Sequence, residues 1–306
     1  MKKKGVLVVG SSNLDLVVTT KRFPNPGETI FGNKFEMFPG GKGANQAVCA
    51  SRLGCKTTFI GKMGNDEFRD RLSQIMVESE VDISSLLVDE DEHTGTALIT
   101  VDSNGQNEII VISGSNMKLT PDDVETKSTL FANASVVLTQ LEIPVDTVVR
   151  AAELAKVNNA IFILNPAPAL PIPNHLLPLI DYITPNESEL ELLSGVKILD
   201  DISVERASRV LISKGVKNVI VTLGEKGSML VSRTVVKHFP VNQVKVVDST
   251  AAGDAFNGAF ASSLSDGHSV DEAIEFANKI ASITVTRMGA QSSMPYLEEI
   301  KNLHSV

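Results

Sequence analysis

The sequence predicts an α/β fold built on a parallel, doubly wound sheet that helices cover. Short apolar or β-branched runs alternate with helix-forming segments along most of the 306 residues. This alternation is interrupted only at residues 14–38 and 95–112, where extended runs replace it. At about 150 residues per domain, the length indicates one large domain or two smaller ones.

The first third of the chain already shows strands and helices in alternation. The predicted strands are residues 6–9, 14–20, 28–38 and 56–60, and the predicted helices are residues 44–53 and 66–77. Asp66 is the expected N-cap of the second helix, because an aspartate oxygen can accept a hydrogen bond from a free N–H group of the first turn.

A β-hairpin is predicted between the first third and the rest of the chain. Residues 95–101 and 108–112 are rich in β-branched residues, and the sequence Asp-Ser-Asn-Gly at 102–105 joins them. We expect this hairpin to pair with residues 14–38 as a small separate sheet, which would form a lid beside a ligand site. The alternative is an ordinary antiparallel edge of the main sheet.

The alternation of strands and helices resumes after the hairpin. Thr120 caps a helix that has Pro121 at its first position. The other predicted helices begin at residue 145 and residue 187 and span 204–214, 252–264 and 270–287, and the predicted strands are 136–141, 161–164, 182–184, 219–223, 228–231 and 244–247.

Composition excludes several classes of protein. The formal net charge is −9 and no basic block follows Lys2, Lys3 and Lys4, so the chain would repel a nucleic-acid backbone. The apolar runs are too short for a signal peptide or a membrane span, which predicts a cytoplasmic protein. Two cysteines cannot build a disulfide framework or a four-ligand zinc site.

Common nucleotide and hydrolase motifs are missing. Lys42 is followed by Gly43, which breaks the P-loop pattern, and Gln46 stands where the dinucleotide pattern requires its third glycine. Neither a GxSxG elbow nor an HExxH pair occurs. P-loop NTPases, dinucleotide oxidoreductases, serine hydrolases and zinc proteases are therefore disfavoured.

A glycine cluster at a helix start predicts a site for a polar, uncharged ligand. It comprises Gly40, Gly41, Lys42, Gly43 and, after Ala44, Asn45. Glycines let a polyol approach the backbone closely, and an asparagine amide both donates to and accepts from hydroxyl groups. A plain glycine turn before a core helix would look similar.

Asn13 and Asp15 follow the first strand, where side chains of a doubly wound sheet point into the ligand crevice. Both residue types are equally typical of turns.

Residues 248–256 are the most informative segment. Small residues from Thr250 to Gly253 lead into a helix and leave its first N–H groups unobstructed, so they form an anion hole for a transferred phosphoryl group. Asp254 in that first turn can accept the proton of an attacking hydroxyl group. In the alternative interpretation, Asp254 only complements the helix dipole.

Two further segments suit a nucleotide. Asn186 and Glu189 lie three residues apart at a helix start, where they could order metal-bound water near phosphate groups. The glycines in residues 222–227 follow a strand and could cradle a ligand with their backbone. Asn186 with Glu189 is also typical of a helix cap.

Together these segments resemble the ribokinase-like, or PfkB, family of carbohydrate kinases. The resemblance covers essentially the whole chain and rests on GSSNLD at 10–15, PGGKGANQA at 39–47, LNPAPA at 164–169, ITPNESE at 183–189, VTLGEKG at 221–227, DSTAAGDAFNGA at 248–259 and VTRMGAQSS at 285–293. It implies a three-layer α/β/α fold, with residues 1–306 as one catalytic domain. It also implies a discontinuous β lid from about 14–38 and 95–112 that pairs with a second subunit in a homodimer.

The resemblance also assigns roles to individual residues. It implies pentose binding by Asn13, Asp15, Gly41, Lys42, Gly43, Asn45, Glu142 and Asp254. It implies catalysis by Asp254 as base, with Ala252 and Gly253 in the anion hole. It implies nucleotide binding by Asn186, Thr222, Gly224, Glu225, Gly227, Gly253 and Asn278. It implies a monovalent-cation site at Asp248, Thr250, Thr284, Arg287, Gly289 and Ser293, and a link to Mg²⁺ through water at Asn186 and Glu189. Histidine is also familiar at position 278, so adenine stacking on Asn278 is expected to differ.

The implied activity is the ATP-dependent phosphorylation of D-ribose at its primary hydroxyl group, which gives D-ribose 5-phosphate and ADP. Mg²⁺ on the phosphate groups and K⁺ as activator are the implied ions. Two alternatives remain open: another sugar or nucleoside kinase of the same family, and a non-catalytic sugar sensor of the same fold.

Overall fold

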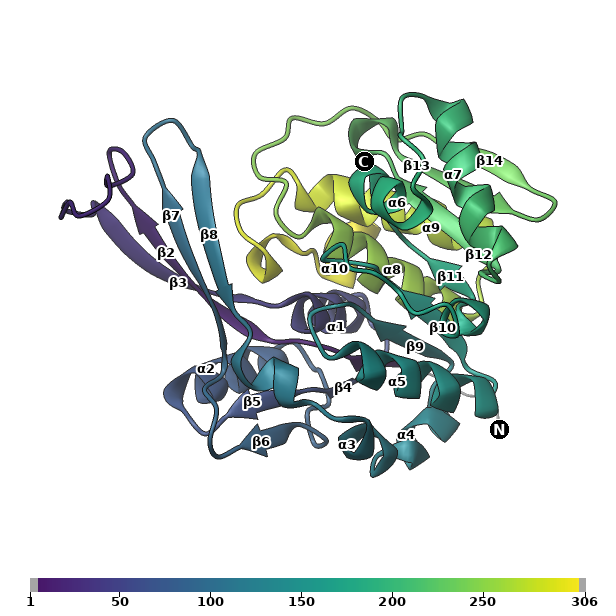
Figure 1. Cartoon of the computed structure of the whole chain (residues 1–306), viewed down its shortest axis with the longest axis horizontal. Helices are drawn as coiled ribbons and strands as arrows, with labels where there is room; N and C mark the ends of the chain where they lie inside the picture. Colours follow the sequence, from purple (N-terminus) through teal and green to yellow (C-terminus); the bar gives the residue numbers. More distant parts are fainter. Residues whose placement is uncertain (1–4, 303–306) are drawn as a thin grey trace.

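The computed structural model describes residues 5–302, which form a central sheet between two helical layers and a second sheet that projects from this body (Figure 1). The central sheet has eight strands in the order β14-β13-β12-β11-β10-β9-β1-β4. All neighbours from β12 to β4 are parallel, whereas β13 and β14 add two antiparallel strands at one edge. The predicted α/β class with a mainly parallel sheet is therefore confirmed.

The strands of the central sheet are short, and most are apolar because both of their faces are buried; the edge strand Val236–Phe239 differs, since its first three residues are exposed. They are β1 (Val6–Val9), β4 (Thr57–Ile60), β9 (Val136–Thr139), β10 (Ile161–Leu164), β11 (Tyr182–Ile183), β12 (Asn218–Thr222), β13 (Ser228–Ser232) and β14 (Val236–Phe239). Within β1, Leu7 and Val9 pack into one core cluster, and Val6 and Val8 pack into the other.

These two clusters separate the helices into layers. The helices are α1 (Lys42–Arg52), α2 (Glu67–Glu78), α3 (Pro121–Glu125), α4 (Ser128–Asn133), α5 (Val145–Val157), α6 (Glu187–Ser194), α7 (Asp201–Ser213), α8 (Ala252–Asp266), α9 (Val270–Thr284) and α10 (Leu297–Asn302). Buried side chains of α1, α2, α8 and α9 belong to one cluster, and those of α3 to α7 belong to the other. The three-layer arrangement follows from this division.

The second sheet contains four strands in the order β3-β2-β7-β8. They are β2 (Asn13–Thr19), β3 (Lys34–Gly40), β7 (Gly95–Val101) and β8 (Asn107–Ile112). The predicted separate sheet is confirmed, and the alternative of an edge on the main sheet is wrong. A further small pair, β5 (Lys62–Gly64) with β6 (Leu87–Asp89), lies beneath it (Figure 1).

Some predicted boundaries were wrong. Residues 28–33 are not a strand, because β3 begins only at Lys34, where Thr19 of β2 is available as its pairing partner. Residues 244–247 have no strand partner, and Val244 and Val246 line a cavity instead. The unpredicted strand β14 pairs with β13 through a tight turn. Helix α9 ends at Thr284, three residues earlier than predicted, and turns follow it.

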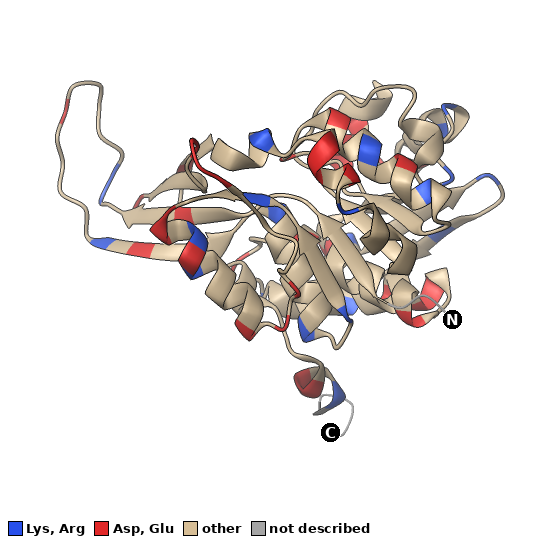
Figure 2. Ribbon diagram, turned by 90° about the horizontal axis from the view of Figure 1, so that it is seen from below, with Lys and Arg blue, Asp and Glu red and all other residues tan. Residues whose placement is uncertain are grey.

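The surface carries acidic and basic residues interspersed over helices and loops, as Figure 2 shows from below. Among the described helices, none combines the length and the apolar character that a membrane crossing requires. The cytoplasmic location stays a prediction.

Candidate active site

Polar side chains from four segments meet where the projecting sheet joins the body. Asn13 is buried in β2, and its Oδ1 accepts a hydrogen bond of 2.7 Å from Nδ2 of Asn116. Glu142 follows β9, and its Oε2 accepts from the backbone N–H of Lys42 at 2.9 Å and from Oγ of Ser11 at 2.5 Å. The sequence-predicted sugar residues are therefore brought together, with Ser11 and Asn116 as supports that the sequence did not indicate.

Gly41 makes this junction possible. Its φ of 84° lies in the left-handed region, and a Cβ atom there would come within 2.6 Å of the backbone of Ser12 and Asn13. Gly41 thus lets the chain's own backbone pass close by, and α1 begins immediately after it at Lys42. The approach of a polyol to this cluster stays a prediction.

Asp254 lies in the first turn of α8 and is only 6% exposed. Its Oδ2 accepts a hydrogen bond of 2.9 Å from Nδ2 of Asn45, and its Oδ1 accepts one of 2.9 Å from Nε2 of Gln46. The fold therefore joins the two most informative segments of the sequence, although they are about 200 residues apart.

Lys42 lies among carboxylates at this point. The nearby Asp254 raises the pKa of the ammonium group most, and Glu142, Glu189 and Asp15 raise it further, although burial opposes them. Burial raises the pKa of Asp15 to about 7, with Glu142 and Asp254 adding to the effect and Lys42 partly opposing it. An ammonium group beside carboxylates gives a polar site for hydroxyl groups that also tolerates a phosphoryl group.

The N-terminus of α8 is open to a neighbouring cavity. Ala251 precedes the helix with φ of 59°, an uncommon conformation for a residue other than glycine. A Cβ atom placed on Gly253 would meet no atom within 4 Å. Because the first N–H groups of a helix have no intrahelical partner, this opening favours an anion at the helix start.

A cavity of about 640 Å³ lies beside this helix start. Its lining includes every sequence-predicted nucleotide residue, together with Ala252: Asn186, Thr222, Gly224, Glu225, Gly227, Gly253 and Asn278. Its apolar walls come from Val241, Val244, Val246, Phe256, Ala281 and Val285. Apolar walls with few polar groups are typical of small-molecule sites, and these dimensions admit a nucleotide.

Asn186 and Glu189 form a capping box at the start of α6. Oδ1 of Asn186 accepts from the N–H of Glu189 at 2.8 Å, and Oε2 of Glu189 accepts from the N–H of Asn186 at 2.9 Å. Burial raises the pKa of Glu189, while the Asn186 N–H group and the charge of Lys42 oppose that effect. The helix-cap interpretation is therefore correct, and Asn186 borders the cavity as well.

Residues of the expected cation site come from two adjoining loops. Oδ1 of Asp248 accepts from the N–H of Thr250 at 2.9 Å, and its Oδ2 accepts from the N–H of Gly289 at 2.8 Å. Burial acts to raise the pKa of Asp248, but these hydrogen bonds outweigh it and leave the pKa below its usual value.

The other three residues of that expected site have bonds of their own. Oγ1 of Thr284 donates to the carbonyl of Ile280, and Oγ of Ser293 donates to the carbonyl of Ala290. The Arg287 guanidinium forms an ion pair of 2.7 Å with Glu299. Arg287 can therefore offer a cation only its backbone carbonyl, whereas the hydroxyl oxygens of Thr284 and Ser293 keep lone pairs beside their own carbonyls.

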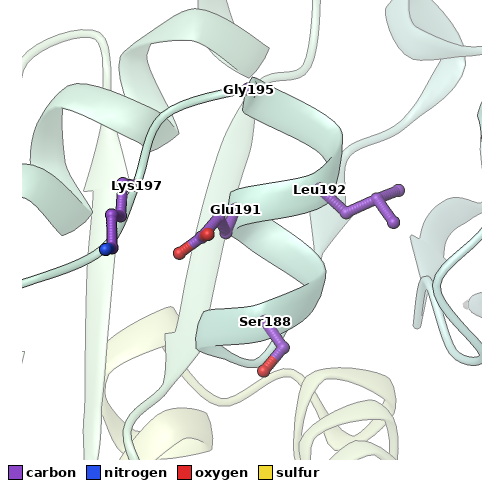
Figure 3. A pocket seen from close by; sticks show the side chains of 5 residues that line it. All are labelled: Ser188, Glu191, Leu192, Gly195 and Lys197. Atoms are coloured by element: carbon purple, nitrogen blue, oxygen red, sulfur yellow. The ribbon is translucent and has the colours of Figure 1, made fainter.

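A second hollow lies on the outer side of α6 (Figure 3). Its lining consists of Ser188, Glu191, Leu192, Gly195 and Lys197. All five residues belong to one helix and the turn after it, and none of them is a sequence-predicted site residue. The cavity beside α8 is therefore the candidate site.

Sequence reasoning missed a set of buried amides that connect to Asp254, either directly or through Gln46 and Asn45. Gln46, Gln140 and Gln291 are at most 2% exposed, and Asn165 is 6% exposed. Gln46 and Asn165 lie inside the segments PGGKGANQA and LNPAPA. The only sequence signal for a role of Gln46 and Asn165 was their position next to recognisable motif residues.

Comparison with known proteins agrees with this geometry. The family model described as pfkB family carbohydrate kinase matches residues 3–297. A ribokinase of Staphylococcus aureus is 41% identical over 97% of this chain and 99% of its own length. A deoxyribokinase of Salmonella typhi is 35% identical, covering 98% and 99% of the two chains.

A solved structure of Arabidopsis thaliana ribokinase, complexed with ribose and ATP, has the same fold. It superposes with a TM-score of 0.93 at 35% identity and covers 99% of each chain. The family match over nearly the whole chain, the identity to these relatives and the arrangement of the candidate site lead to one conclusion. The chain belongs to the PfkB family of carbohydrate kinases.

Proposed function

We propose that this protein transfers the γ-phosphoryl group of ATP to the 5-hydroxyl group of D-ribose. The observation that carries the proposal is the position of Asp254. It hydrogen-bonds to Asn45 on the side of the sugar residues, and the adjacent Gly253 lines the cavity on the other side. The relatives named ribokinase and the ribokinase structure with ribose and ATP support this choice of substrates.

Asp254 acts as the base in this reaction. Its carboxylate takes the proton of the ribose 5-hydroxyl group while that oxygen forms a bond to the γ-phosphorus atom. The bond between the γ-phosphorus and the bridging oxygen breaks at the same time, and ADP leaves with that oxygen. The N–H groups at the start of α8, near Ala252 and Gly253, stabilise the charge that develops on the transferred group.

The sugar is held by Asn13, Asp15 and Asn45 through hydrogen bonds to its hydroxyl groups, with Glu142 at the edge of the site. Gly41 and Gly43 let residues 10–13 pack directly against the start of α1, because a Cβ atom on either glycine would come within 2.6 Å of that backbone. Lys42 balances the carboxylates around the sugar, and among them Asp254 raises the pKa of its ammonium group most. A pocket this polar fits a polyol better than the base of a nucleoside.

Mg²⁺ fits this site as an ion held mainly by phosphate groups and water. Among residues 5–302, no three His, Cys, Asp or Glu side chains form a cage for a metal ion. Glu189 uses one carboxylate oxygen in the capping box, so the second remains to accept from a metal-bound water. When bound, the ion neutralises charge on the phosphate groups.

K⁺ fits the two loops that carry Asp248, Thr250 and Gly289. Carbonyl and carboxylate oxygens are the ligands expected for a large monovalent cation, and the two segments are tied together by hydrogen bonds to Asp248 and to the carbonyl of Val285. Thr284, Arg287 and Ser293 would contribute backbone carbonyls. Order in these loops fixes the backbone that leads to Ala251 and the start of α8.

We also propose that the four-stranded sheet is a lid through which two copies of the chain form a homodimer. All six residues of β8 are exposed, and among them Ile109, Ile110 and Val111 are 52%, 63% and 54% exposed. An apolar strand this exposed favours burial against another surface. Residues 1–306 then act as one catalytic domain with the lid at about 14–38 and 95–112.

A substrate panel tests the proposed function. ADP release is measured with ATP, Mg²⁺ and one of ribose, 2-deoxyribose, fructose, adenosine or fructose 6-phosphate. We expect the highest kcat/KM with ribose. A preference for 2-deoxyribose would transfer the assignment to the activity that the Salmonella relative is named for, and no release with any sugar would contradict the kinase assignment.

A further inference from the structure

Gln46 has no role in the reaction described so far, although it contacts the proposed base directly. Its side chain is completely buried, and its Nε2 donates to Oδ1 of Asp254 at 2.9 Å and to Oδ1 of Asn165 at 3.0 Å. Its Oε1 accepts from Nε2 of Gln140 at 2.6 Å. Three side chains therefore fix one amide next to Asp254.

The direction of this amide is determined by a backbone carbonyl. The carbonyl of Thr184 can only accept, so Asn165 must present Nδ2 to it, and the two lie 3.2 Å apart. Oδ1 of Asn165 then faces Gln46, so Gln46 must donate to it from Nε2. Gln46 consequently presents an N–H donor to Asp254 and an acceptor to Gln140.

Gln140 shows that this orientation has a cost. Its Nε2 is directed to Gln46, and its buried Oε1 has no hydrogen-bond partner. An unpartnered buried amide oxygen is uncommon in folded proteins. Reversing the Gln140 amide would instead bring its oxygen against Oε1 of Gln46. The observed amide orientations therefore leave the Oε1 atom of Gln140 without a partner and direct an N–H donor of Gln46 to Asp254.

The two donors on Asp254 are not equivalent. Asn45 is one of the sugar-binding residues, and its Oδ1 also accepts from Nε2 of Gln291 at 3.1 Å. When a sugar hydroxyl group binds Asn45, the Asn45 amide must divide its hydrogen bonds between the sugar and its protein partners Asp254 and Gln291. Gln46 lies behind Asp254 with its hydrogen-bonding groups already engaged, so its bond to Oδ1 does not depend on the sugar.

We propose that Gln46 is the positioning residue for Asp254, an inference that rests on the proposed function. Its bond to Oδ1 stabilises the ionised carboxylate, which has to remain a base while buried, and fixes the plane of the carboxylate toward the sugar hydroxyl group. The contribution appears in kcat rather than in sugar binding, because Gln46 lies behind the base.

A double-mutant cycle with Asp254 tests this role. Gln46→Met keeps a similar length and removes the donor, and we expect kcat to fall about tenfold to hundredfold with less than threefold change in KM for ribose. In the Asp254→Asn background, the same substitution should lower the residual rate less than twofold. A loss in that background as large as in the wild type would overturn the proposal.

A second variant covers the case in which Gln46→Met does not fold. Gln46→Glu preserves the shape and the acceptor for Gln140 but places a carboxylate oxygen against Oδ1 of Asp254. Because like charges repel, we expect a loss in kcat at least as large as for Gln46→Met. Asp254→Asn removes that repulsion, so the loss should again shrink. An unchanged kcat in the Gln46→Glu variant would overturn the proposal as well.

Thr147→Val is the matched control for lost stability. Oγ1 of Thr147 is equally buried and donates to the carbonyl of Leu119 at 2.6 Å, on α5 and outside this network. We expect a lower midpoint of urea unfolding and an unchanged kcat. If Thr147→Val lowers kcat as much as Gln46→Met does, the Gln46 effect is general destabilisation. All variants are assayed with the substrate that the panel selects, so an error in the sugar assignment would not be mistaken for failure of this inference.

Discussion

The carboxyl group of Asp15 should destabilise the ligand-free protein at alkaline pH. Burial, with Glu142 and Asp254, raises its pKa from 3.8 to about 7. The folded state therefore binds this proton more tightly than the unfolded state does, which is the reverse of the usual case for an aspartate. The free energy of unfolding then increases as the pH falls from 7 toward 4, and the ionised group is unfavourable above pH 7. Replacing Asp15 with asparagine should accordingly stabilise the protein at pH 8.

The size of this effect follows from the shift in pKa. A rise of about 3 pKa units corresponds to about 4 kcal/mol at pH 8, at about 1.4 kcal/mol per unit. The asparagine amide must still find partners in the same site, so we expect Asp15→Asn to add about 1–4 kcal/mol at pH 8. At pH 5.5 the wild-type carboxyl is mostly protonated, and the advantage of the variant should be about 2 kcal/mol smaller.

Urea unfolding of the ligand-free protein at pH 8 and pH 5.5 measures this difference. Asp70→Asn is the control, because Asp70 is a surface carboxylate whose side chain is 70% exposed, and its replacement should change stability little at either pH. An equal effect of Asp15→Asn at the two pH values would refute the reasoning. So would a variant less stable than the wild type at pH 8.

Three further predictions concern activity and assembly. Asp254→Asn should lower kcat by about 10²–10⁴ with ribose affinity retained in calorimetry, and near-normal turnover would remove Asp254 from the chemistry. Replacing Na⁺ with K⁺ at constant ionic strength and fixed Mg²⁺ should raise kcat severalfold, with Asp248→Ala reducing the difference; equal rates in the two salts would contradict the cation site. Light scattering should show a dimer at micromolar concentration that Ile110→Asp dissociates, whereas Ile202→Asp, at a residue 78% exposed on α7, should leave it intact. A monomeric wild type would count against the lid interface.

The central sheet was predictable because its strands carry their own signal. Residues 6–9 and 161–164 are apolar on both faces, as a strand between two helical layers must be, and the observed strands have the same bounds. The hairpin at 95–112 was predictable from its turn residues. Strand β14 was not, because Val236–Phe239 becomes a strand through pairing with β13, whereas residues 244–247, which are richer in β-branched residues, have no strand partner.

Individual residues of the candidate site were predictable from the sequence, but the hydrogen bonds between them were not. The glycines, Asn45 and Asp254 belong to conspicuous motifs, and the predicted nucleotide residues all line one cavity. The bonds of Gln46 to Asp254, Asn165 and Gln140 join four places in the chain through the fold alone. A buried glutamine has no spacing or composition that distinguishes it from a surface one, so tertiary structure was needed to find it.

Strand β2 connects the sugar site with the far part of the lid as one stiff element. Asp15 lies near its base, and Thr19 ends it at the loop that projects into solvent (Figure 1). The four residue steps from Asp15 to Thr19 span about 13 Å, so a tilt of about 10° at Asp15 moves the far end by about 2 Å. If subunit pairing restrains the far end of β2, it changes the position of Asp15, and the affinity for sugar must then depend on protein concentration. Because coupling between two binding events is reciprocal, sugar must strengthen the subunit pairing by the same factor.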